Sequence, residues 1–327
     1  MRYVFIVNPR AGNGKAARKL VPQIEAYFHE TGEAYHVYFT EYPGHAASLA
    51  HREAVMGGSV RIYVCGGAGT IFEVLGGIVG YKNVELGAFP CGTANDFLRW
   101  FGNGLDFLNV EKQVRGSSIP IDIIRAGEQY AANICAAGLE AETATAFSHL
   151  RDIAVFGGKA AYRLSVIYSL WTLVGREMEI TINGEPPIRG EFLGVLAANG
   201  PCFGGIYTAA PGARLNDGIL EFNLISPSSR IQLASFFNTC RRGEKTENHP
   251  ACRHIRGQSM KISCKEDIPV CMDGEVFRYR EITFQVVPCA VNFLVPGVCA
   301  EKWEQEQAKR VAAPARRAPC ANDSLCK

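Results

Sequence analysis

Residues 61–70 read RIYVCGGAGT, an apolar β-type run that passes directly into a glycine-rich turn. Residues 71–79 follow with the character of a helix. A strand, a tight turn and a helix in this order are typical of a crossover unit, in which the next strand lies parallel to the first. The stretch therefore predicts a parallel sheet in which the strand at 61–65 is buried on both faces.

The same alternation extends over the first 90 residues. Strand-like runs lie at 3–7, 34–39, 61–65 and 86–89, and helix-prone runs lie at 15–28, 46–56 and 71–79. This order predicts an α/β fold, with a doubly wound, mainly parallel sheet covered by helices on both faces. Ligands of such sheets bind beyond the carboxyl ends of the strands. The loops after residues 7, 65 and 89 are therefore the candidate site.

From about residue 120 the pattern changes to short β-type runs joined by Gly, Pro and Asn turns. These runs are 121–125, 129–135, 177–183, 191–198, 220–225, 260–264, 270–272 and 282–287, with helix-prone segments only at 159–174 and 229–241. They predict a β-rich, antiparallel, sandwich-like second domain. We expect a first domain over 1–118, a second over 119–297, and a C-terminal helix with a disordered tail over 298–327.

The composition excludes several classes of protein. Hydrophobic residues make up 47% of the 327 positions and charged residues 20%, which is the balance of a folded globular chain. Lys and Arg number 34 against 32 Asp and Glu, and this small excess lies in the segment after residue 300. The remaining chain is formally neutral, so we expect no nucleic acid as a partner.

The twelve cysteines predict neither a disulfide framework nor a zinc site. Their spacing is irregular, no C-x-x-C occurs, and the histidines show no metal-ligand spacing. The chain opens on the strand-like run at 3–7 without a secretory leader, and the apolar stretch at 164–174 is too short to cross a bilayer. We therefore expect a cytoplasmic protein with reduced thiols and no transmembrane segment.

Three glycine-bearing loops follow the predicted parallel strands. They span residues 8–15, 66–70 and 92–97. A glycine-rich turn that opens a helix exposes backbone N–H groups at the positive end of the helix dipole, which favours a phosphate. One such loop is readily explained as an ordinary turn, but three at one sheet edge favour a polyphosphate site.

The first loop leaves a second interpretation open. Gly12, Gly14 and Ala17 partly match a dinucleotide-binding fingerprint, although the acidic residue after the second strand, Glu41, comes later than that motif requires. The loop is not a Walker A motif, because both its four-residue spacer and the Ser or Thr after Lys15 are missing. An NAD(P)-binding oxidoreductase therefore stays an alternative at this point.

A pair of acids near the C-terminal end of the β-rich domain is the candidate catalytic group. Asp273 and Glu275 are two positions apart, so their side chains project to the same side of an extended segment. Gly274 between them would let a substrate approach closely. The alternative is an exposed Asp-Gly hairpin turn with two solvated acids.

Taken together, the motifs resemble those of the bacterial diacylglycerol kinase family, which includes other bacterial lipid kinases and is related to sphingosine and ceramide kinases. The resemblance covers residues 1 to about 297. The matching segments, in family order, are Asn8-Pro9-x-x-Gly12, Gly66-Gly67-x-Gly69-Thr70-x-x-Glu73, Gly92-Thr93-x-Asn95-Asp96-Phe97 and Asp273-Gly274-Glu275. It implies an ATP-binding first domain, a lipid-binding and catalytic second domain, and transfer of the γ-phosphate of Mg·ATP to a lipid hydroxyl such as that of diacylglycerol.

The family implies roles for particular residues. Glu275 matches the position assigned as proton acceptor, with Asp273 beside it. Asp96 and Asp122 match a carboxylate network around the catalytic Mg²⁺, and Asp217 with the backbone carbonyls of Arg214 and Ile219 matches a structural Mg²⁺ site. The implied ATP contacts are Asn8, Pro9, Arg10, Ala11, Gly12, Thr40, Gly66, Gly67, Ala68, Gly69, Thr70, Glu73, Thr93 and Asn95.

One position departs from the family pattern. Where the family's middle loop carries an aspartate of the Mg²⁺ network, this chain carries Ala68, which supplies neither a charge nor an acceptor. Loss of one carboxylate from such a network costs about 10–100-fold in metal affinity or activity. A catalytically impaired nucleotide- or lipid-binding protein is therefore the first alternative, and an NAD kinase, which shares a similar loop, is a more distant one.

The resemblance also implies a lipid partner. The lipid would lie between the two domains, with Phe203, Tyr207 and the run at 162–174 as candidates for the acyl side, although apolar residues of this kind more often serve ordinary core packing. We expect a peripheral protein at the inner membrane surface, and a homodimer is left open.

Overall fold

The computed structural model describes residues 1–14, 16–92, 95–102, 104–138, 141, 174–297, 299–300 and 303. Several predicted features fall outside these residues. They are Lys15, Thr93, the helix at 159–174 apart from Val174, and the tail after residue 303.

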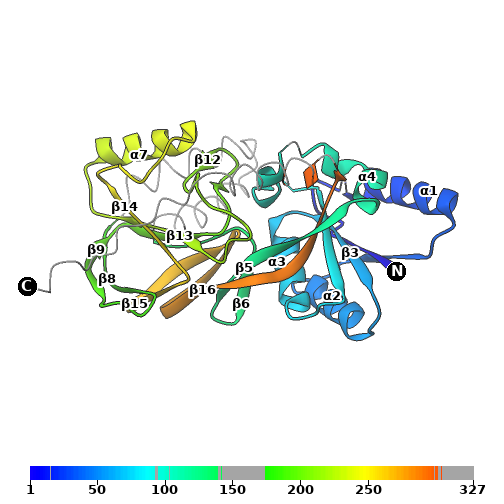
Figure 1. The fold of residues 1–327 in the computed structure, drawn as a ribbon, viewed down its shortest axis with the longest axis horizontal. Coiled ribbons are helices and arrows are strands. Elements are labelled where there is room, and N and C mark those ends of the chain that lie inside the picture. Colours follow the sequence, from blue (N-terminus) through cyan, green and yellow to red (C-terminus); the bar gives the residue numbers. More distant parts are fainter. Residues whose placement is uncertain are drawn as a thin grey trace, which may run out of the picture.

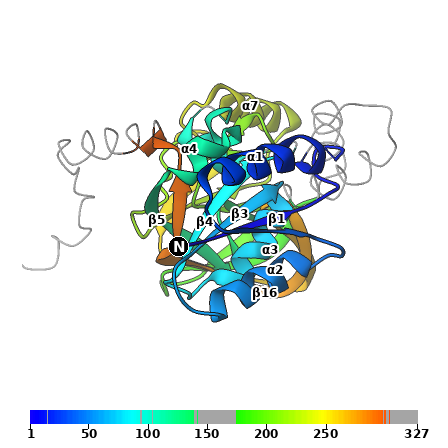
Figure 2. The same ribbon diagram turned by 90° about the vertical axis from the view of Figure 1, so that its right-hand side faces the viewer.

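The N-terminal lobe is built on a parallel sheet, as the sequence predicts. Its strands are β1 (Arg2–Val7), β2 (Tyr35–Phe39), β3 (Val60–Gly66) and β4 (Val84–Pro90), in the order β4-β3-β1-β2. The helices between them are α1 (Val21–Thr31), preceded by the helical turn η1 (Ala16–Leu20), then α2 (His45–Val55) and α3 (Ala68–Ile78). In Figure 2, α1 lies on one side of the strands and α2 and α3 lie on the other.

Both faces of this sheet are buried, which explains its continuous apolar strands. In β1, Val4 and Ile6 pack in the core shared with α2 and α3, whereas Phe5 and Val7 pack in the core shared with α1. Alternate residues of a strand point to opposite faces. An apolar residue at every position is therefore what a sheet between two helical layers requires.

The second lobe is β-rich and antiparallel. Its strands are β5 (Ser117–Ala126), β6 (Gln129–Ala131), β7 (Ile134–Gly138), β8 (Arg176–Ile182), β9 (Ile188–Phe192), β10 (Gly194–Ala198), β11 (Cys202–Phe203), β12 (Tyr207–Thr208), β13 (Leu220–Ile225), β14 (Cys252–Gly257), β15 (Ser259–Met272) and β16 (Glu275–Val295). Helix α7 (Arg230–Arg242) lies over β13 and β14 (Figure 1). The predicted fold class is therefore confirmed.

Two long strands connect the lobes. β16 pairs with β15 and β5 in the second lobe, and its last residues pair in parallel with β4, where Phe293 lies opposite Leu86. The register of β16 with β5 shifts between Val287 and Val291, which marks a bulge. All strands except β11 and β12 therefore belong to one 14-stranded sheet, and the domain boundary near residue 118 stays a prediction.

The sequence missed the short strands β11 and β12 and three further parts of this fold. The first is β14, whose residues Arg253, His254 and Arg256 hide any β pattern. The second is the extension of β16 beyond Pro288, a residue that usually ends a strand. The third comprises the short helical segments η2 (Phe97–Phe101), η3 (Asp106–Leu108) and α4 (Val110–Val114).

Helix α7 begins and ends where the sequence predicts. The Ser229 side chain accepts a hydrogen bond from the Gln232 backbone N–H, and the Gln232 side chain accepts one from the Ser229 N–H, which is a capping box. Gly243 closes the helix with φ 68°.

Candidate active site

The loops after β1, β2 and β3 are joined to one another at the carboxyl edge of the parallel sheet. The Asn8 side-chain amide donates to Thr70 Oγ1 at 3.2 Å, and the Asn8 backbone N–H donates to the Cys65 carbonyl at 3.0 Å. The Thr40 N–H donates to the Val7 carbonyl at 2.9 Å. Within the first loop, the Arg10 N–H donates to Asn8 Oδ1 at 3.0 Å, and Pro9, Ala11 and Gly12 complete the turn beside it.

The loop after β3 and the loop after β4 approach each other through bare glycine backbone. A Cβ at Gly92 would lie 2.6 Å from the Gly67 Cα, and a Cβ at Gly67 would lie 3.2 Å from the Gly92 Cα. Gly67 is also the residue that caps α3, whose first turn carries backbone N–H groups that the helix itself cannot pair. The result is a narrow cradle of amides at a helix N-terminus, which suits a phosphate.

Asn95 brings an amide oxygen to the same cradle. It adopts the left-handed conformation at φ 51°, and its side-chain nitrogen donates to the Gly92 carbonyl at 2.8 Å. Its Oδ1 is buried and has no hydrogen-bond partner among the described residues. A buried acceptor without a partner is costly, so this atom suits a donor that a ligand or its bound water would bring.

Asp96 connects the N-terminal lobe to the second lobe. Its Oδ1 accepts from the Gly205 N–H at 2.9 Å and lies 3.5 Å from the Arg99 guanidinium. Burial raises the pKa of this carboxyl, and the Gly205 hydrogen bond and Arg99 oppose that rise. Asp96 therefore lies at the same edge as the glycine loops, as the sequence predicts.

Glu275 comes from the second lobe and reaches the first turn of α3. A Cβ at Gly69 would lie 2.6 Å from Glu275 Oε1, so in this arrangement the carboxylate lies directly against Gly69. The contact continues one turn along the helix, where the rings of Phe72 and Phe277 are 6.0 Å apart. Glu275 itself is exposed, and it lies beside the loop formed by Gly66, Gly67 and Ala68.

The Asp273 carboxylate binds backbone N–H groups of its own lobe. Its carboxylate accepts backbone hydrogen bonds from Ala132 at 2.7 Å, Asn133 at 3.1 Å and Ile134 at 2.8 Å. Burial raises the pKa of Asp273 to about 6, and these three N–H groups, which favour the ionised form, oppose the rise. Asp273 therefore fixes the hairpin that carries Glu275.

The expectation that residues 273–275 form an extended segment is wrong. Met272 pairs with Glu275 across the hairpin, and Asp273 and Gly274 form a two-residue turn with φ 49° and 101°. Two positive φ values are typical of the tight hairpin turn that an Asp-Gly sequence favours. The two acids consequently face different partners, although the turn still brings Glu275 to the loops.

Glu73 lies one turn further along α3. Its Oε2 accepts a hydrogen bond from the Ala46 N–H at 3.1 Å, in the first turn of α2. A carboxylate at a helix N-terminus stabilises that helix. Its contact in this structure is therefore with α2.

The acids at 122 and 217 both contact the segment 217–219. Asp122 accepts from the Gly218 N–H at 2.7 Å and from the Cys289 N–H at 2.8 Å. Asp217 accepts from the Ile219 N–H at 3.2 Å and pairs with Arg256 Nη2 at 2.9 Å. The grouping of Asp122 with Asp96 around a catalytic Mg²⁺ stays a prediction.

Asn133 and Arg256 contribute contacts that the site prediction did not include. The Asn133 side chain donates to the Cys202 carbonyl at 2.9 Å, which ties the Asp273 turn to the segment leading to Gly205. Arg256 bridges Asp217 and Glu221. No motif marks Arg256, which is distant in sequence from Asp217.

Phe203 and Tyr207 belong to the core of the second lobe. Their rings stack at 5.4 Å, Tyr207 packs edge-on against Phe237 of α7, and each residue is 7% exposed. Core packing, the alternative weighed for these residues, is therefore what the structure shows.

Comparisons with known proteins match this combination of lobes. A diacylglycerol kinase catalytic domain matches residues 2–126, and a YegS C-terminal NAD kinase beta sandwich-like domain matches residues 133–295. A diacylglycerol kinase of Bacillus subtilis (strain 168) is 29% identical over 275 residues, which cover 83% of this chain and 88% of that protein. One of Staphylococcus carnosus (strain TM300) is 27% identical over 273 residues, covering 83% and 87%.

Solved structures share the fold. A crystal structure of a diacylglycerol kinase from Bacillus anthracis str. Sterne aligns with a TM-score of 0.65 and 20% identity, covering 90% of this chain and 96% of that one. The two lobes have the architecture of the diacylglycerol kinase type. The chain belongs to the family of bacterial diacylglycerol and lipid kinases.

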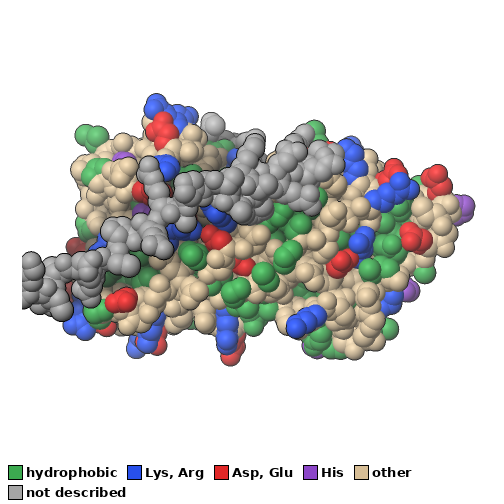
Figure 3. Space-filling view, in the orientation of Figure 1, with side chains coloured by type: hydrophobic (Ala, Val, Ile, Leu, Met, Phe, Trp, Pro, Cys, Tyr) green, Lys and Arg blue, Asp and Glu red, His purple; other side chains and the backbone are tan. Residues whose placement is uncertain are grey.

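Two surface properties bear on its partners. In the described part of the chain, no helix has the length and apolar character needed to cross a bilayer. Where described residues form the face shown in Figure 3, acidic and basic side chains are interspersed and no large area of one sign appears. This pattern agrees with the near-neutral composition and does not favour a nucleic acid on that face.

Proposed function

We propose that this chain transfers the γ-phosphoryl group of Mg·ATP to the hydroxyl of a lipid such as diacylglycerol, at the inner membrane surface, with Glu275 as the general base. One observation carries the proposal: the Glu275 carboxylate from the second lobe lies against Gly69 in the phosphate-type loop of the first. A base for the acceptor hydroxyl and a cradle for the phosphates are the groups that phosphoryl transfer requires from a protein.

The residues at this edge fit Mg·ATP. The close approach of Gly67 and Gly92 brings the backbones of two loops together with no side chain between them, and Asn95 Oδ1 offers a buried acceptor without a partner among the described residues. Asp96 supplies a carboxylate next to Asn95. When bound, Mg²⁺ neutralises charge on the phosphates.

The loops, Glu275 and Asp273 have different roles in this transfer. The loops that contain Asn8, Gly67 and Gly92 hold the phosphates through backbone N–H groups. Glu275 accepts the proton of the lipid hydroxyl as the new O–P bond forms and the bond to the β-phosphate oxygen breaks, which releases ADP. Asp273 positions the Glu275 turn and touches no reacting atom.

The test is transfer of labelled phosphate from ATP to a panel of lipids in mixed micelles. Phosphorylated diacylglycerol or another phosphorylated lipid is the expected product. If ATP binds and no lipid in the panel is labelled, the kinase function is contradicted and the nucleotide-binding alternative gains support. Both matched domain descriptions name kinases and neither names an oxidoreductase, which favours the kinase over the dinucleotide alternative.

Replacing Gly69 with Ala should lower kcat about 10–100-fold, because the new Cβ displaces Glu275 Oε1 from its place beside α3. The same change should raise the melting temperature slightly, since Ala is about 1 kcal/mol better than Gly inside a helix. Gly76→Ala is the matched control: it lies in the same helix and a Cβ there meets nothing within 4 Å. Equal activity of both variants would show that Glu275 does not act from this position.

A second candidate function, a binding protein with impaired catalysis, is favoured by Ala68. Of the three positions that the family network uses, 68, 96 and 122, this chain keeps a carboxylate at Asp96 and Asp122 and lacks one at Ala68. Ala68→Asp should therefore raise the transfer rate about 10–100-fold. An aspartate in the first turn of α3 also suits the helix dipole, so the variant should fold.

The control for this variant is Ala68→Asn, which has nearly the same shape as the aspartate but no charge. A rate increase in the aspartate variant alone would show that a missing carboxylate limits the natural chain. If neither variant changes the rate, the chain does not depend on an acid at position 68.

A further inference from the structure

The segment 209–219 connects β5 to other strands of the second lobe. The Asp122 backbone N–H of β5 donates to the Leu215 carbonyl, and the Asp122 carboxylate accepts from the Gly218 N–H. At the start of the segment, the Ala209 carbonyl accepts from the side chains of Asn223 and Thr246. Whatever fixes Asp217 therefore fixes a connection between β5 and the rest of the second lobe.

Asp217 already has a cation as its partner. Its Oδ2 lies 2.9 Å from Arg256 Nη2, and its Oδ1 accepts from the Ile219 N–H at 3.2 Å. A positive side chain therefore already lies against this carboxylate, and a divalent cation would have to enter against its charge.

Arg256 does not serve Asp217 alone. Its Nε lies 3.2 Å from Glu221 Oε1, so one guanidinium bridges two carboxylates. Glu221 is buried, with its side chain 5% exposed, and its other oxygen lies 3.1 Å from His254 Nε2. A guanidinium suits this double contact, because its N–H donors lie in one rigid plane and can reach two carboxylates at once.

We propose that the Arg256 guanidinium takes the place of a divalent cation at Asp217, so that the connection at 209–219 is held by an internal ion bridge and needs no metal. Asp217 supplies the one carboxylate of the implied metal site, and both of its oxygens are already engaged, one by the Ile219 N–H and the other by Arg256. The inference concerns the fold of this chain and stands independently of the reaction it catalyses.

The test compares thermal unfolding of the full chain, without nucleotide or lipid, in EDTA and in millimolar MgCl₂ or CaCl₂. The natural chain should show the same melting temperature in all three solutions. Arg256→Ala leaves Asp217 and Glu221 facing each other, so its melting temperature should fall in EDTA. In divalent salt the melting temperature of this variant should rise again by roughly 3–6 °C, if the free cation concentration is about ten times the Kd of the new site.

Arg256→Gln is the milder second variant, because its amide can still donate to one carboxylate, and it is used if Arg256→Ala does not fold. Arg253→Ala, an exposed position on the same strand, is the control and should show no response to divalent salt. Binding of Mn²⁺, followed by its electron paramagnetic resonance signal, gives an independent measurement. We expect one new Mn²⁺ site in the Arg256 variants and none at Asp217 in the natural chain.

Two results would overturn the inference. One is a melting temperature of the natural chain that rises by several degrees in MgCl₂ and returns in EDTA, or Mn²⁺ binding to the natural chain that Asp217→Asn abolishes. The other is Arg256 variants that neither gain a Mn²⁺ site nor respond to divalent salt. Both measurements are made without ATP, so a failure of the proposed kinase function would not produce either result.

Discussion

Glu275→Gln is expected to lower kcat for lipid phosphorylation by about 10²–10⁴-fold, the contribution that a positioned general base makes. Glutamine keeps the size of the side chain beside Gly69 but cannot accept the hydroxyl proton. The affinity for ATP should change little, because the phosphate cradle at Gly67 and Gly92 comes from the other lobe. Steady-state transfer of labelled phosphate, together with calorimetric titration of ATP, measures the two effects separately.

Glu281→Gln is the matched control for this variant. It makes the same change on the same strand, at an exposed side chain that pairs with Lys261 on β15. We expect full activity from it. If Glu275→Gln is also fully active, the base lies elsewhere, and Asp273→Asn becomes the next variant to assay.

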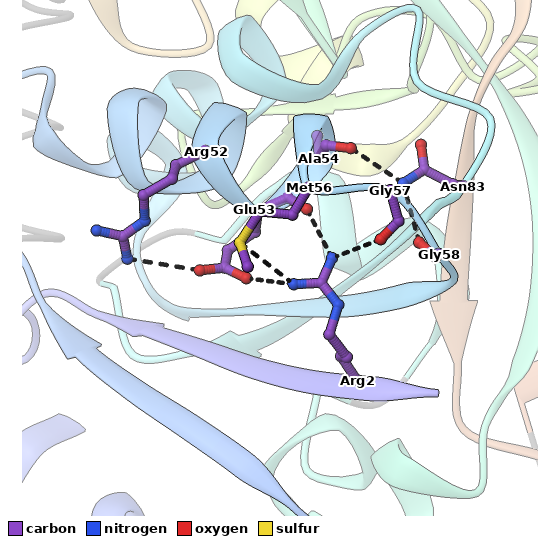
Figure 4. A network of polar contacts seen from close by, with 8 residues as sticks. All are labelled: Arg2, Arg52, Glu53, Ala54, Met56, Gly57, Gly58 and Asn83. Carbon is purple, nitrogen blue, oxygen red and sulfur yellow. Dashed lines mark hydrogen bonds and ion pairs between the residues drawn. The ribbon is translucent and has the colours of Figure 1, made fainter.

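Arg2→Ala is expected to lower the stability of the fold by about 3 kcal/mol, near the lower end for breaking a buried ion pair. Figure 4 shows Arg2 at the start of β1, reaching the end of α2. Its Nη1 lies 2.7 Å from Glu53 Oε2, and its Nη2 donates to the backbone carbonyls of Glu53 and Gly57 at 2.8 and 3.0 Å. The Glu53 side chain is only 3% exposed, so loss of Arg2 leaves a buried charge poorly compensated.

The expected fall in melting temperature for Arg2→Ala is roughly 6–10 °C. Arg52→Ala is the control, because Arg52 contacts the same carboxylate at 3.4 Å from a half-exposed position and stacks over Tyr38 at 4.6 Å. It should cost no more than about 1 kcal/mol. The folded Arg2 variant should retain its kcat, since Arg2 lies at the opposite end of β1 from the Asn8 loop. Equal melting temperatures of the two variants would contradict the larger contribution to stability that we assign to the Arg2–Glu53 ion pair.

The parallel sheet could be predicted because its strands are apolar at every position and glycine loops separate them from helices. The strands at 60–66 and 84–90 follow from this pattern. β14 could not be predicted, since an edge strand with Arg253, His254 and Arg256 carries no apolar alternation. The length of β16 was hidden by Pro288, which the strand tolerates at its bulge with β5.

The candidate site was predictable in part for a similar reason. Glycine loops at strand ends meet at one edge by topology, so Asn8, Gly67 and Asn95 come together as expected. Asp273 and Glu275 contact different groups because a tight turn lies between them. The spacing of two acids by one residue does not reveal which of them is buried. The ion bridge of Arg256 brings together residues distant in sequence, and no local pattern records such a contact.

The paths of β5 and β16 have a consequence for how this chain folds. Because the last residues of β16 complete the sheet beside β4, residues 2–126 alone would leave that edge of β4 without its neighbour. An exposed edge of this kind invites aggregation. The two segments that match separate domain families therefore form one cooperative unit, and heating or denaturant should unfold both in a single transition.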